Sequence, residues 1–453
     1  MPKTNKKEEK KKMKTMKKIL AILLSLAMVF ALTACGGDDT KTGGGKGSGD
    51  GDKKEALQVS EPVTIEFWHT LTADGAAALE AMTKEFNETN EYGITVNATN
   101  QGAYDSVLSK TIASHGTATA PTISLVGAGG IEQLAESGVV ADMAAYVERD
   151  NYDLSNIPES LRYYMEYYEG QVIEFPYLVS SAVLVYNKDL IPTAPTTLEE
   201  WVASAEAVTK ANPGVYGMTL AVDSGFYQRP ILTSLGAPGL TSEDGLSPAG
   251  LDDGALEKLL TDWKGWIDDG FCLRPSVTDF ETKSLNQFAD GKLASYVVSS
   301  ATLHNLRTIA KDKNINYGIT KAVGYGGYSA GIGGGGLVVL DSATQQEQAA
   351  AWEYIKFLYE DDNIVTLHKA TSYLPFTYSS QKSEELAAYW EENPEFAVVV
   401  EQLEWATYNI WSGYLAEWRT QVKNCTTSVV VDGSMTVDAV IKFLQQQATV
   451  IFP

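Results

Sequence analysis

The stretch that decides the fold runs over residues 63–98, VTIEFWHTLTADGAAALEAMTKEFNETNEYGITVNA. An apolar run at 63–67 is followed by residues 76–87, where apolar side chains recur three and four positions apart, and then by a second apolar run at 94–98. This order predicts a strand, a helix and a strand. Because two strands joined by a helix form a βαβ unit, the pattern favours a parallel sheet covered on both faces by helices.

The same alternation continues toward the C-terminus. Two segments, Thr197-Leu198-Glu199-Glu200 and Thr344-Gln345-Gln346-Glu347, have the capping-box pattern that opens a helix. Further strands are predicted at 122–126, 182–186, 293–298 and 337–340, and further helices at 103–114, from Ile131 and from Val437. With 453 residues the chain is too long for one ordinary core, and no internal repeat occurs. The pattern therefore predicts two α/β lobes.

Two lobes of this kind predict a binding cleft. Ligands of open α/β sheets bind at the carboxyl ends of the strands. Where two such sheets face each other, the ends form a cleft, and hinged closure of a cleft on a small molecule is a known switching geometry.

The N-terminus has the features of a lipoprotein leader. Residues 1–34 begin Lys-rich, continue with the apolar run from Ile19 to Ala34, and stop before Cys35 in the sequence Leu-Thr-Ala-Cys-Gly. The apolar run is short for a transmembrane span. This arrangement resembles the bacterial lipoprotein cleavage box, so we expect Cys35 to be lipidated and to begin the mature chain. An uncleaved membrane anchor with an incidental cysteine is the alternative. Residues 35–60 are predicted to be a flexible, acidic, Gly-rich tether.

Charge and cysteine content exclude several classes of function. The formal net charge is -23, and it becomes more negative without the Lys-rich residues 1–34, so the surface repels nucleic acid. A local arginine can still attract an anionic ligand at short range. Besides Cys35, only Cys272 and Cys425 occur, without zinc spacing. We expect no metal, no cofactor and two unpaired buried thiols, although pairing of the two is open.

Two glycine-containing motifs look catalytic but lack the required context. Residues 327–331 (GYSAG) match the GxSxG nucleophile elbow, and residues 331–336 (GIGGGG) match the GxGxxG dinucleotide fingerprint. Both motifs must be followed by a helix. Here the apolar run at 337–340 follows instead and predicts a strand. We therefore expect a Gly-rich loop whose glycines let backbone approach a ligand or a hinge closely.

Eight short pieces in a fixed order resemble a known family. They are Phe67-Trp68-His69-Thr70, Gly102-Ala103-Tyr104, Ala120-Pro121-Thr122-Ile123, Ser180-Ser181 ahead of Tyr186-Asn187-Lys188-Asp189, Ser299-Ser300 ahead of Asn305-Leu306-Arg307, Gly333-Gly334, Tyr373-Leu374-Pro375, and Arg419 six residues after Gly413. From Val63 to about Val422 the chain resembles the family 1 extracellular solute-binding proteins of ABC importers. Within this family it is most similar to the receptors for glycerol 3-phosphate and sugars.

The resemblance implies an α/β, two-lobe, periplasmic-binding-protein-like fold with a hinged interlobe cleft. The expected segments are a signal peptide at 1–34, the tether at 35–60, lobe 1 at 61–178 with about 301–342, and lobe 2 at 179–300 with about 343–453. It also implies ligand-binding roles for Tyr104, Ser180, Ser299, Gly334, Tyr373 and Arg419. These residue types suit that role, because arginine offers a planar fork of donors, serine and tyrosine offer hydroxyls, and glycine offers its backbone N–H.

Each of these residues also has a purely structural alternative. Tyr104 and Tyr373 could only pack, either serine could satisfy a hinge backbone, Gly334 could be conformational, and Arg419 could form an ion pair between the lobes. The chain departs from the glycerol phosphate pattern at Gly127-Ala128, where an acid is expected, and near 222–225, where tryptophans are expected. Phe226 and Tyr227 lie close to the second place and could supply the stacking face.

These observations predict a receptor for a sugar or oligosaccharide, with a polyol phosphate such as glycerol 3-phosphate as the alternative. We expect a monomer on the outer face of the cell membrane, held by its lipid, with permease subunits and a small solute as partners and no nucleic acid. A surface carbohydrate-active enzyme would need an acid and a base at one bond, and no motif supplies them. An adhesin would need an exposed apolar patch in place of a cleft.

Overall fold

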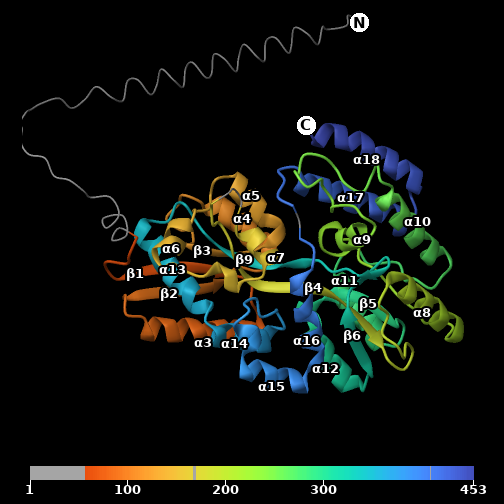
Figure 1. Ribbon diagram of the computed structural model, residues 1–453, viewed down its shortest axis with the longest axis horizontal. Helices are drawn as coiled ribbons and strands as arrows, with labels where there is room; N and C mark the ends of the chain where they lie inside the picture. Colours follow the sequence, from red (N-terminus) through yellow and green to blue (C-terminus); the bar gives the residue numbers. More distant parts are fainter. Residues whose placement is uncertain (1–56, 167–169, 409) are drawn as a thin grey trace, which may run out of the picture. The chain divides into compact units, whose positions relative to one another are not determined.

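The computed structural model of the protein describes residues 57–166, 170–408 and 410–453 (Figure 1). The predicted leader, Cys35 and the tether up to residue 56 lie outside the described residues. Within these ranges, no helix combines the length and the apolar character that a membrane span requires. Cys272 and Cys425 are free and buried, which confirms the expected unpaired thiols.

Five strands form the first part of the main sheet, in the order β2-β1-β3-β9-β4. Their bounds are β1 (Val63–His69), β2 (Ile94–Asn100), β3 (Ile123–Gly127), β4 (Phe175–Asn187) and β9 (Ile332–Val339). The predicted parallel pairing is confirmed for β1 with β2 and β3. It is wrong for β9, which is antiparallel to both β3 and β4. β9 follows two short strands within residues 323–328 with no helix between, so it is not reached through the helix that precedes the second strand of a parallel βαβ unit.

The long strand β4 belongs to both lobes. Its first half, residues 175–181, pairs with β9, and its second half, residues 182–187, pairs with β5 (Ser295–Ser299) and β6 (Tyr317–Lys321). The buried side chain of Gln402 holds the crossing point, because its Nε2 donates to Ser181 Oγ (3.1 Å) and to the carbonyl of Ala182 (2.9 Å). The backbone therefore passes from one lobe to the other at a fixed place in β4.

Helices cover the first part of the sheet on both faces. Figure 1 shows α3 (Ala73–Thr89) and α14 (Asp361–Thr371) on one side and α4 (Tyr104–Ser114) and α5 (Ala128–Glu136) on the other. The apolar stripe predicted in the first helix explains its packing, because Leu79, Met82 and Phe86 are buried. Three further helices complete this lobe: α6 (Ala144–Arg149), α7 (Glu159–Met165) and α13 (Gln345–Leu358).

The second lobe surrounds β5 and β6. Its helices are α8 (Leu198–Ala211), α9 (Arg229–Ser234), α10 (Ala255–Asp268), α11 (Phe280–Ala289), α12 (Leu303–Lys313), α15 (Glu384–Glu392), α16 (Pro394–Val400), α17 (Leu415–Val430) and α18 (Val437–Ile451). A small hairpin, β7 (Val323–Gly324) with β8 (Gly327–Tyr328), precedes β9. The two glycine motifs thus lead into a strand and not a helix, which confirms that neither has the catalytic context. The expected loop is wrong from residue 332 onward, because the glycines there are part of β9.

Both predicted capping boxes lie at helix starts, but only one is complete. Thr344 accepts a hydrogen bond from the backbone N–H of Glu347, and the Glu347 carboxylate accepts from the backbone N–H of Thr344. Thr197 also accepts from the backbone of Glu200, but the Glu200 carboxylate accepts from the backbone of Thr196 instead (2.8 Å). The two caps therefore differ in the backbone N–H that the glutamate carboxylate accepts from, which is one residue further back at Thr196.

The segments predicted for each lobe differ from the observed packing at two places. Residues 317–321, predicted for lobe 1, form β6 and pair with the second half of β4. Residues 345–371, predicted for lobe 2, form α13 and α14, which pack against β1 and α3. The chain crosses between the lobes more often than local sequence patterns reveal, because a crossing inside an apolar strand leaves no break in composition.

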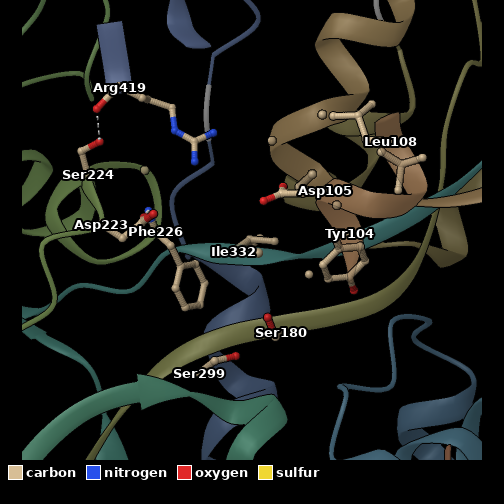
Figure 2. Close-up of a pocket in the computed structure, with 18 of the residues that line it drawn as sticks. Tyr104, Asp105, Leu108, Ser180, Asp223, Ser224, Phe226, Ser299, Ile332 and Arg419 are labelled. Atoms are coloured by element: carbon tan, nitrogen blue, oxygen red, sulfur yellow. Dashed lines mark hydrogen bonds between the residues drawn. The ribbon is translucent and has the colours of Figure 1, made fainter. Parts of the chain in front are cut away.

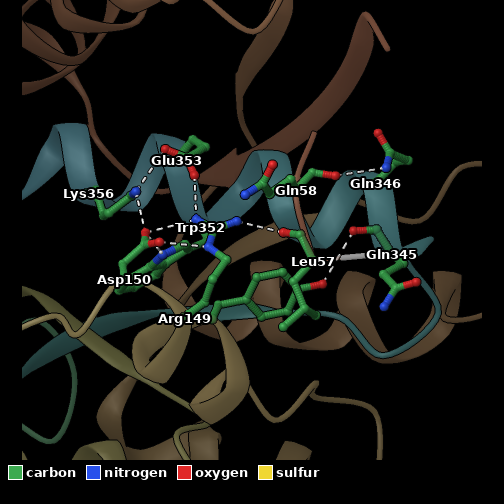
Figure 3. Close-up of polar contacts among 10 residues, drawn as sticks. Leu57, Gln58, Arg149, Asp150, Gln345, Gln346, Trp352, Glu353 and Lys356 are labelled. Carbon is green, nitrogen blue, oxygen red and sulfur yellow. Dashed lines mark hydrogen bonds and ion pairs between the residues drawn. The ribbon is translucent and has the colours of Figure 1, made fainter. Parts of the chain in front are cut away.

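The end of the predicted tether is fixed to the first lobe. The carbonyl of Leu57, within the predicted tether at 35–60, accepts a hydrogen bond from Arg149 Nη1 (2.6 Å) (Figure 3). Arg149 is held in turn by Glu353 (2.6 Å), which also pairs with Lys356 (2.8 Å). The Arg149 and Glu353 side chains are only 7% and 10% exposed, so this ion pair is partly desolvated. The tether prediction is therefore too long at its C-terminal end.

Candidate binding site

A cavity of about 600 Å³ lies beside the crossing point of β4. Its walls come from both lobes and from the strands that join them. The lining residues are Tyr104, Asp105, Leu108 and 126–130 from the first lobe, Ser180, 332–334 and Tyr373 near the crossing, and 223–226, Glu281, Ser299, Ala301, Ala416, Arg419, Thr420 and Lys423 from the second lobe. All six residues predicted to bind a ligand line this one cavity; their binding role itself stays a prediction.

Tyr104 and Tyr373 place two phenol hydroxyls at one end of the cavity. Tyr104 is the first residue of α4, and its ring lies against Gly127 and Gly335, where an added Cβ would come 3.0 and 2.6 Å from ring atoms. Its hydroxyl lies 3.5 Å from that of Tyr373. Burial of the hydroxyl raises the pKa of Tyr104 well above its ordinary value, and burial also raises the pKa of Tyr373. Both phenols therefore stay protonated and can donate.

A buried histidine fixes the backbone of Tyr373. The indole N–H of Trp390 can only donate, and it donates to His368 Nε2 (3.2 Å). The proton of the imidazole must then be on Nδ1, which donates to the carbonyl of Tyr373 (2.7 Å). Burial lowers the pKa of His368 to about 4, so the ring is neutral at physiological pH. This arrangement could not be predicted from the sequence, because the hydrogen bond from Trp390 to His368 joins two different helices.

The two serines differ in how they are used. Ser180 is 3% exposed, pairs with Gly333 across the β4–β9 ladder, and its hydroxyl makes no hydrogen bond to any described residue. Its neighbour Ser181 points to the opposite face, as strand geometry requires, and donates to the carbonyl of Gly331 (3.1 Å). Ser299 Oγ accepts a weak hydrogen bond from the backbone of Ala301 (3.4 Å). The structural alternative thus applies partly to Ser299, whose hydroxyl proton remains available to a ligand.

Gly334 has a conformational requirement. Its φ is +110°, and an added Cβ would lie 1.7 Å from the carbonyl oxygen of Leu178 on the paired strand. Only glycine fits this position. The conformational alternative for Gly334 is therefore real, and its proposed backbone contact with a ligand stays a prediction.

The guanidinium of Arg419 faces the cavity and has no hydrogen-bond partner among the described residues. Figure 2 shows its side chain reaching from α17 into the cavity, while its backbone carbonyl accepts a hydrogen bond from Ser224 Oγ (3.0 Å). The guanidinium has two glycines beside it, since an added Cβ would lie 2.9 Å from Nη1 at Gly129 and 2.6 Å from Nε at Gly225. It makes no hydrogen bond or ion pair within the described ranges. No ion pair within 4 Å joins Arg419 to an acid of the first lobe among the described residues, although, against the larger effect of burial, its charge acts on the Glu132 carboxyl and lowers the pKa of that group.

Three acids that the sequence did not single out also line the cavity. Asp105 is exposed on α4, and Asp223 accepts from the backbone of Phe226 (2.7 Å) at the π-helical turn η2 (Ser224–Gln228). Glu281 accepts from the Tyr227 hydroxyl, and burial raises the pKa of its carboxyl. Of the two aromatic residues considered as a stacking face, Phe226 lines the cavity, whereas Tyr227 lies buried behind it. No motif marks these acids among the 58 in the chain.

A carboxylate beside the cavity predicts a pH dependence of stability. Glu132 on α5 accepts from the backbone N–H of Ser412, and burial raises its pKa from 4.5 to about 7. Between these pH values the unfolded state binds fewer protons than the native state, so the free energy of unfolding falls as pH rises. We expect Glu132→Gln to remove this fall and to stabilise the protein at pH 8 by on the order of 2 kcal/mol.

Urea unfolding of the wild type and Glu132→Gln between pH 4 and 8.5 measures this effect. Glu148→Gln, on an exposed position of α6, is the control and should leave the pH profile unchanged. Parallel profiles for the wild type and Glu132→Gln would contradict the assignment.

Comparison with known proteins places the chain in a family. A family model described as bacterial extracellular solute-binding protein matches residues 81–398. The sn-glycerol-3-phosphate-binding periplasmic protein UgpB of Rhizobium meliloti (strain 1021) is 26% identical over 356 residues, covering 75% of this chain and 81% of that protein. UgpB from Mycobacterium tuberculosis in complex with glycerophosphocholine has a TM-score of 0.74 at 20% identity, covering 86% of this chain and 98% of that chain.

A second solved structure has the same architecture. The GacH receptor of Streptomyces glaucescens, solved unliganded and with acarbose, has a TM-score of 0.73 at 19% identity, covering 86% of this chain and 98% of that chain. Together the two structures confirm the predicted two-lobe α/β fold. Since the family model matches more than half of the residues, the chain belongs to the bacterial extracellular solute-binding protein family.

Proposed function

We propose that the chain is the extracytoplasmic receptor of an ABC importer, which captures a carbohydrate-type solute, a sugar or oligosaccharide, between its lobes and delivers it to the permease. The observation that carries this proposal is one cavity of about 600 Å³ in which hydroxyls from both lobes meet the ring of Phe226 and the guanidinium of Arg419. This volume suits a small solute. A flat apolar face combined with directional donors and acceptors is the surface that a polyhydroxylated ring requires.

A polyol phosphate is the second candidate. It is favoured by the uncommitted guanidinium of Arg419, because a planar fork of donors binds phosphate in a bidentate manner. The names of the relatives, which bind sn-glycerol 3-phosphate or were solved with glycerophosphocholine, support it as well. Against it stand Asp105, Asp223 and Glu281, which bring negative charge to the same cavity.

The experiment is a calorimetric and thermal-shift screen of the purified protein against sugars, oligosaccharides and polyol phosphates. A ligand at 100 times its Kd should add about 2.7 kcal/mol to the free energy of unfolding. Binding without turnover supports the receptor, and any product released from a glycan would instead support a carbohydrate-active enzyme. If no member of either class binds, the proposed function is wrong.

The anchoring of the protein is proposed from the leader sequence. We infer that Cys35 carries the lipid and holds a monomeric receptor on the outer face of the cell membrane. Membership of an extracellular protein family supports this location. The relatives are named as binding proteins, which supports a receptor over an enzyme. Metabolic labelling with palmitate should mark the wild type but not Cys35→Ser, and the variant should leave the membrane fraction. Equal labelling of both would exclude Cys35 as the lipidation site.

A further inference from the structure

Arg229 is a buried cation without a hydrogen-bond partner among the described residues. The residue opens α9 directly after the π-helical turn η2, and it is 1% exposed. None of its three guanidinium nitrogens has a hydrogen-bond partner within the described chain. Burial lowers the pKa of Arg229 to about 10, which still leaves the group charged at neutral pH. An unpaired buried charge destabilises the folded state, so a role outside stability would account for its presence.

The guanidinium lies directly behind the wall of the cavity. An added Cβ at Gly331 would lie 2.9 Å from Arg229 Nη2 and 2.7 Å from the carbonyl oxygen of Phe226. Phe226 and Ile332, the residue after Gly331, both line the cavity. Only one layer of protein therefore separates this charge from a bound solute.

The charges around the cavity show what Arg229 contributes. Two cations, Arg419 and Lys423, and three acids, Asp105, Asp223 and Glu281, line the cavity. With the lining residues alone, the acids outnumber the cations and would disfavour an anionic solute. Burial is the largest effect on the pKa of Arg229 and lowers it; Tyr164 and then Asp223 raise this pKa, whereas Arg419 lowers it, so Arg229 interacts with charges of the cavity wall. Arg229 supplies the cation that offsets the third acid.

We propose that Arg229 is a specificity-determining residue whose buried charge, acting through the layer formed by Phe226 and Gly331, offsets the acids of the cavity and lets it accept a carbohydrate that carries a negative group. The class includes sugar phosphates, sugar acids and polyol phosphates. This inference rests on the proposed function and specifies the charge of the solute. Arg229 does not contact the solute and acts at a distance, so it changes the preference for charge and leaves the fit of the hydroxyls unchanged.

The test compares matched anionic and neutral probes on the full protein. The pairs are glucose 6-phosphate with glucose, and sn-glycerol 3-phosphate with glycerol. A unit charge on the order of 10 Å away, at an effective dielectric constant of about 20, changes an affinity by roughly tenfold. Arg229→Met should therefore reduce the anion-to-neutral affinity ratio about tenfold. Its urea unfolding midpoint should stay the same or rise, because the variant removes an unpaired buried charge.

Arg229→Lys is the matched control, since it keeps the charge and should keep the ratio within about threefold of the wild type. Asp223→Asn removes the nearest acid that lines the cavity and should raise the ratio. The opposite signs of the effects on affinity and stability separate this role from a structural one, which would lower both.

Three outcomes for Arg229→Met, and one for the wild type, would overturn the inference. They are an unchanged ratio in Arg229→Met, an equal loss for the anionic and neutral probes, and a marked loss of stability or failure to fold in that variant. Binding of the neutral probes alone by the wild type would also overturn it while leaving the proposed function standing. If the wild type binds none of the sugars or polyol phosphates, the proposed function fails as well.

Discussion

Arg419→Met is expected to weaken binding of the solute by 100- to 1,000-fold. The guanidinium faces the cavity and has no partner among the described residues, so its donors are free for a ligand. Two charge-assisted hydrogen bonds contribute about 1.5–2 kcal/mol each to binding, which corresponds to a change of two to three powers of ten in Kd. Titration calorimetry with the best solute from the screen measures the loss.

The same change should leave the stability of the unliganded protein almost unchanged. Because Arg419 donates no side-chain hydrogen bond and forms no ion pair within the described chain, the urea midpoint of Arg419→Met should stay near that of the wild type. Arg419→Lys keeps the charge but loses the planar fork, so it should recover only part of the affinity. A normal Kd in Arg419→Met, or a large loss of stability, would show that Arg419 has a structural role.

The six residues named from the resemblance line one cavity, while their binding role stays a prediction. Tyr104, Ser180 and Arg419 lie far apart in sequence, and no periodicity connects them. They were found because each stands in a short motif whose order along the chain is that of the family. The structure brings them together, since β4 carries Ser180 to the crossing point, and α4 and α17 approach the cavity from the two lobes.

The features that could not be predicted from the sequence depend on tertiary contacts. Glu281 is one acid among 58, and only its hydrogen bond from Tyr227 and its place on the cavity wall distinguish it. Arg229 is followed by a proline at a helix start, which is an ordinary local pattern, and its isolation follows from the packing of Gly331 and Phe226. The antiparallel pairing of β9 was missed because strand direction depends on the connection that precedes the strand, and the alternation of apolar residues does not record it.

The placement of the lining residues also bears on how binding is coupled to closure. Tyr104 comes from the first lobe, whereas Ser299 and Arg419 come from the second. A solute that contacts all three gains its full set of interactions only when the lobes are together. By linkage, such a solute shifts the population toward the closed arrangement by its difference in affinity for the two states.

Gly334→Ala is the change expected to affect stability most. The residue has φ of +110° and pairs with Val179 where β9 meets β4, so a methyl group would enter the space of the Leu178 carbonyl at 1.7 Å. Relief requires the backbones of two buried strands to separate at the junction of the lobes. We expect the free energy of unfolding to fall by at least about 4 kcal/mol, together with loss of solute binding. Urea unfolding of the purified variant provides the measurement.

Gly326→Ala separates the effect of packing from that of the left-handed backbone alone. Gly326 also has positive φ, +71°, but lies in the turn between β7 and β8, where an added Cβ would meet nothing within 4 Å. That variant should lose only about 1 kcal/mol, the ordinary cost of a left-handed conformation for a residue with a side chain. If Gly334→Ala lost no more than Gly326→Ala, the two strands could separate at little cost at the junction, and the β4–β9 pairing would not be the rigid element that holds Ser180 at the cavity.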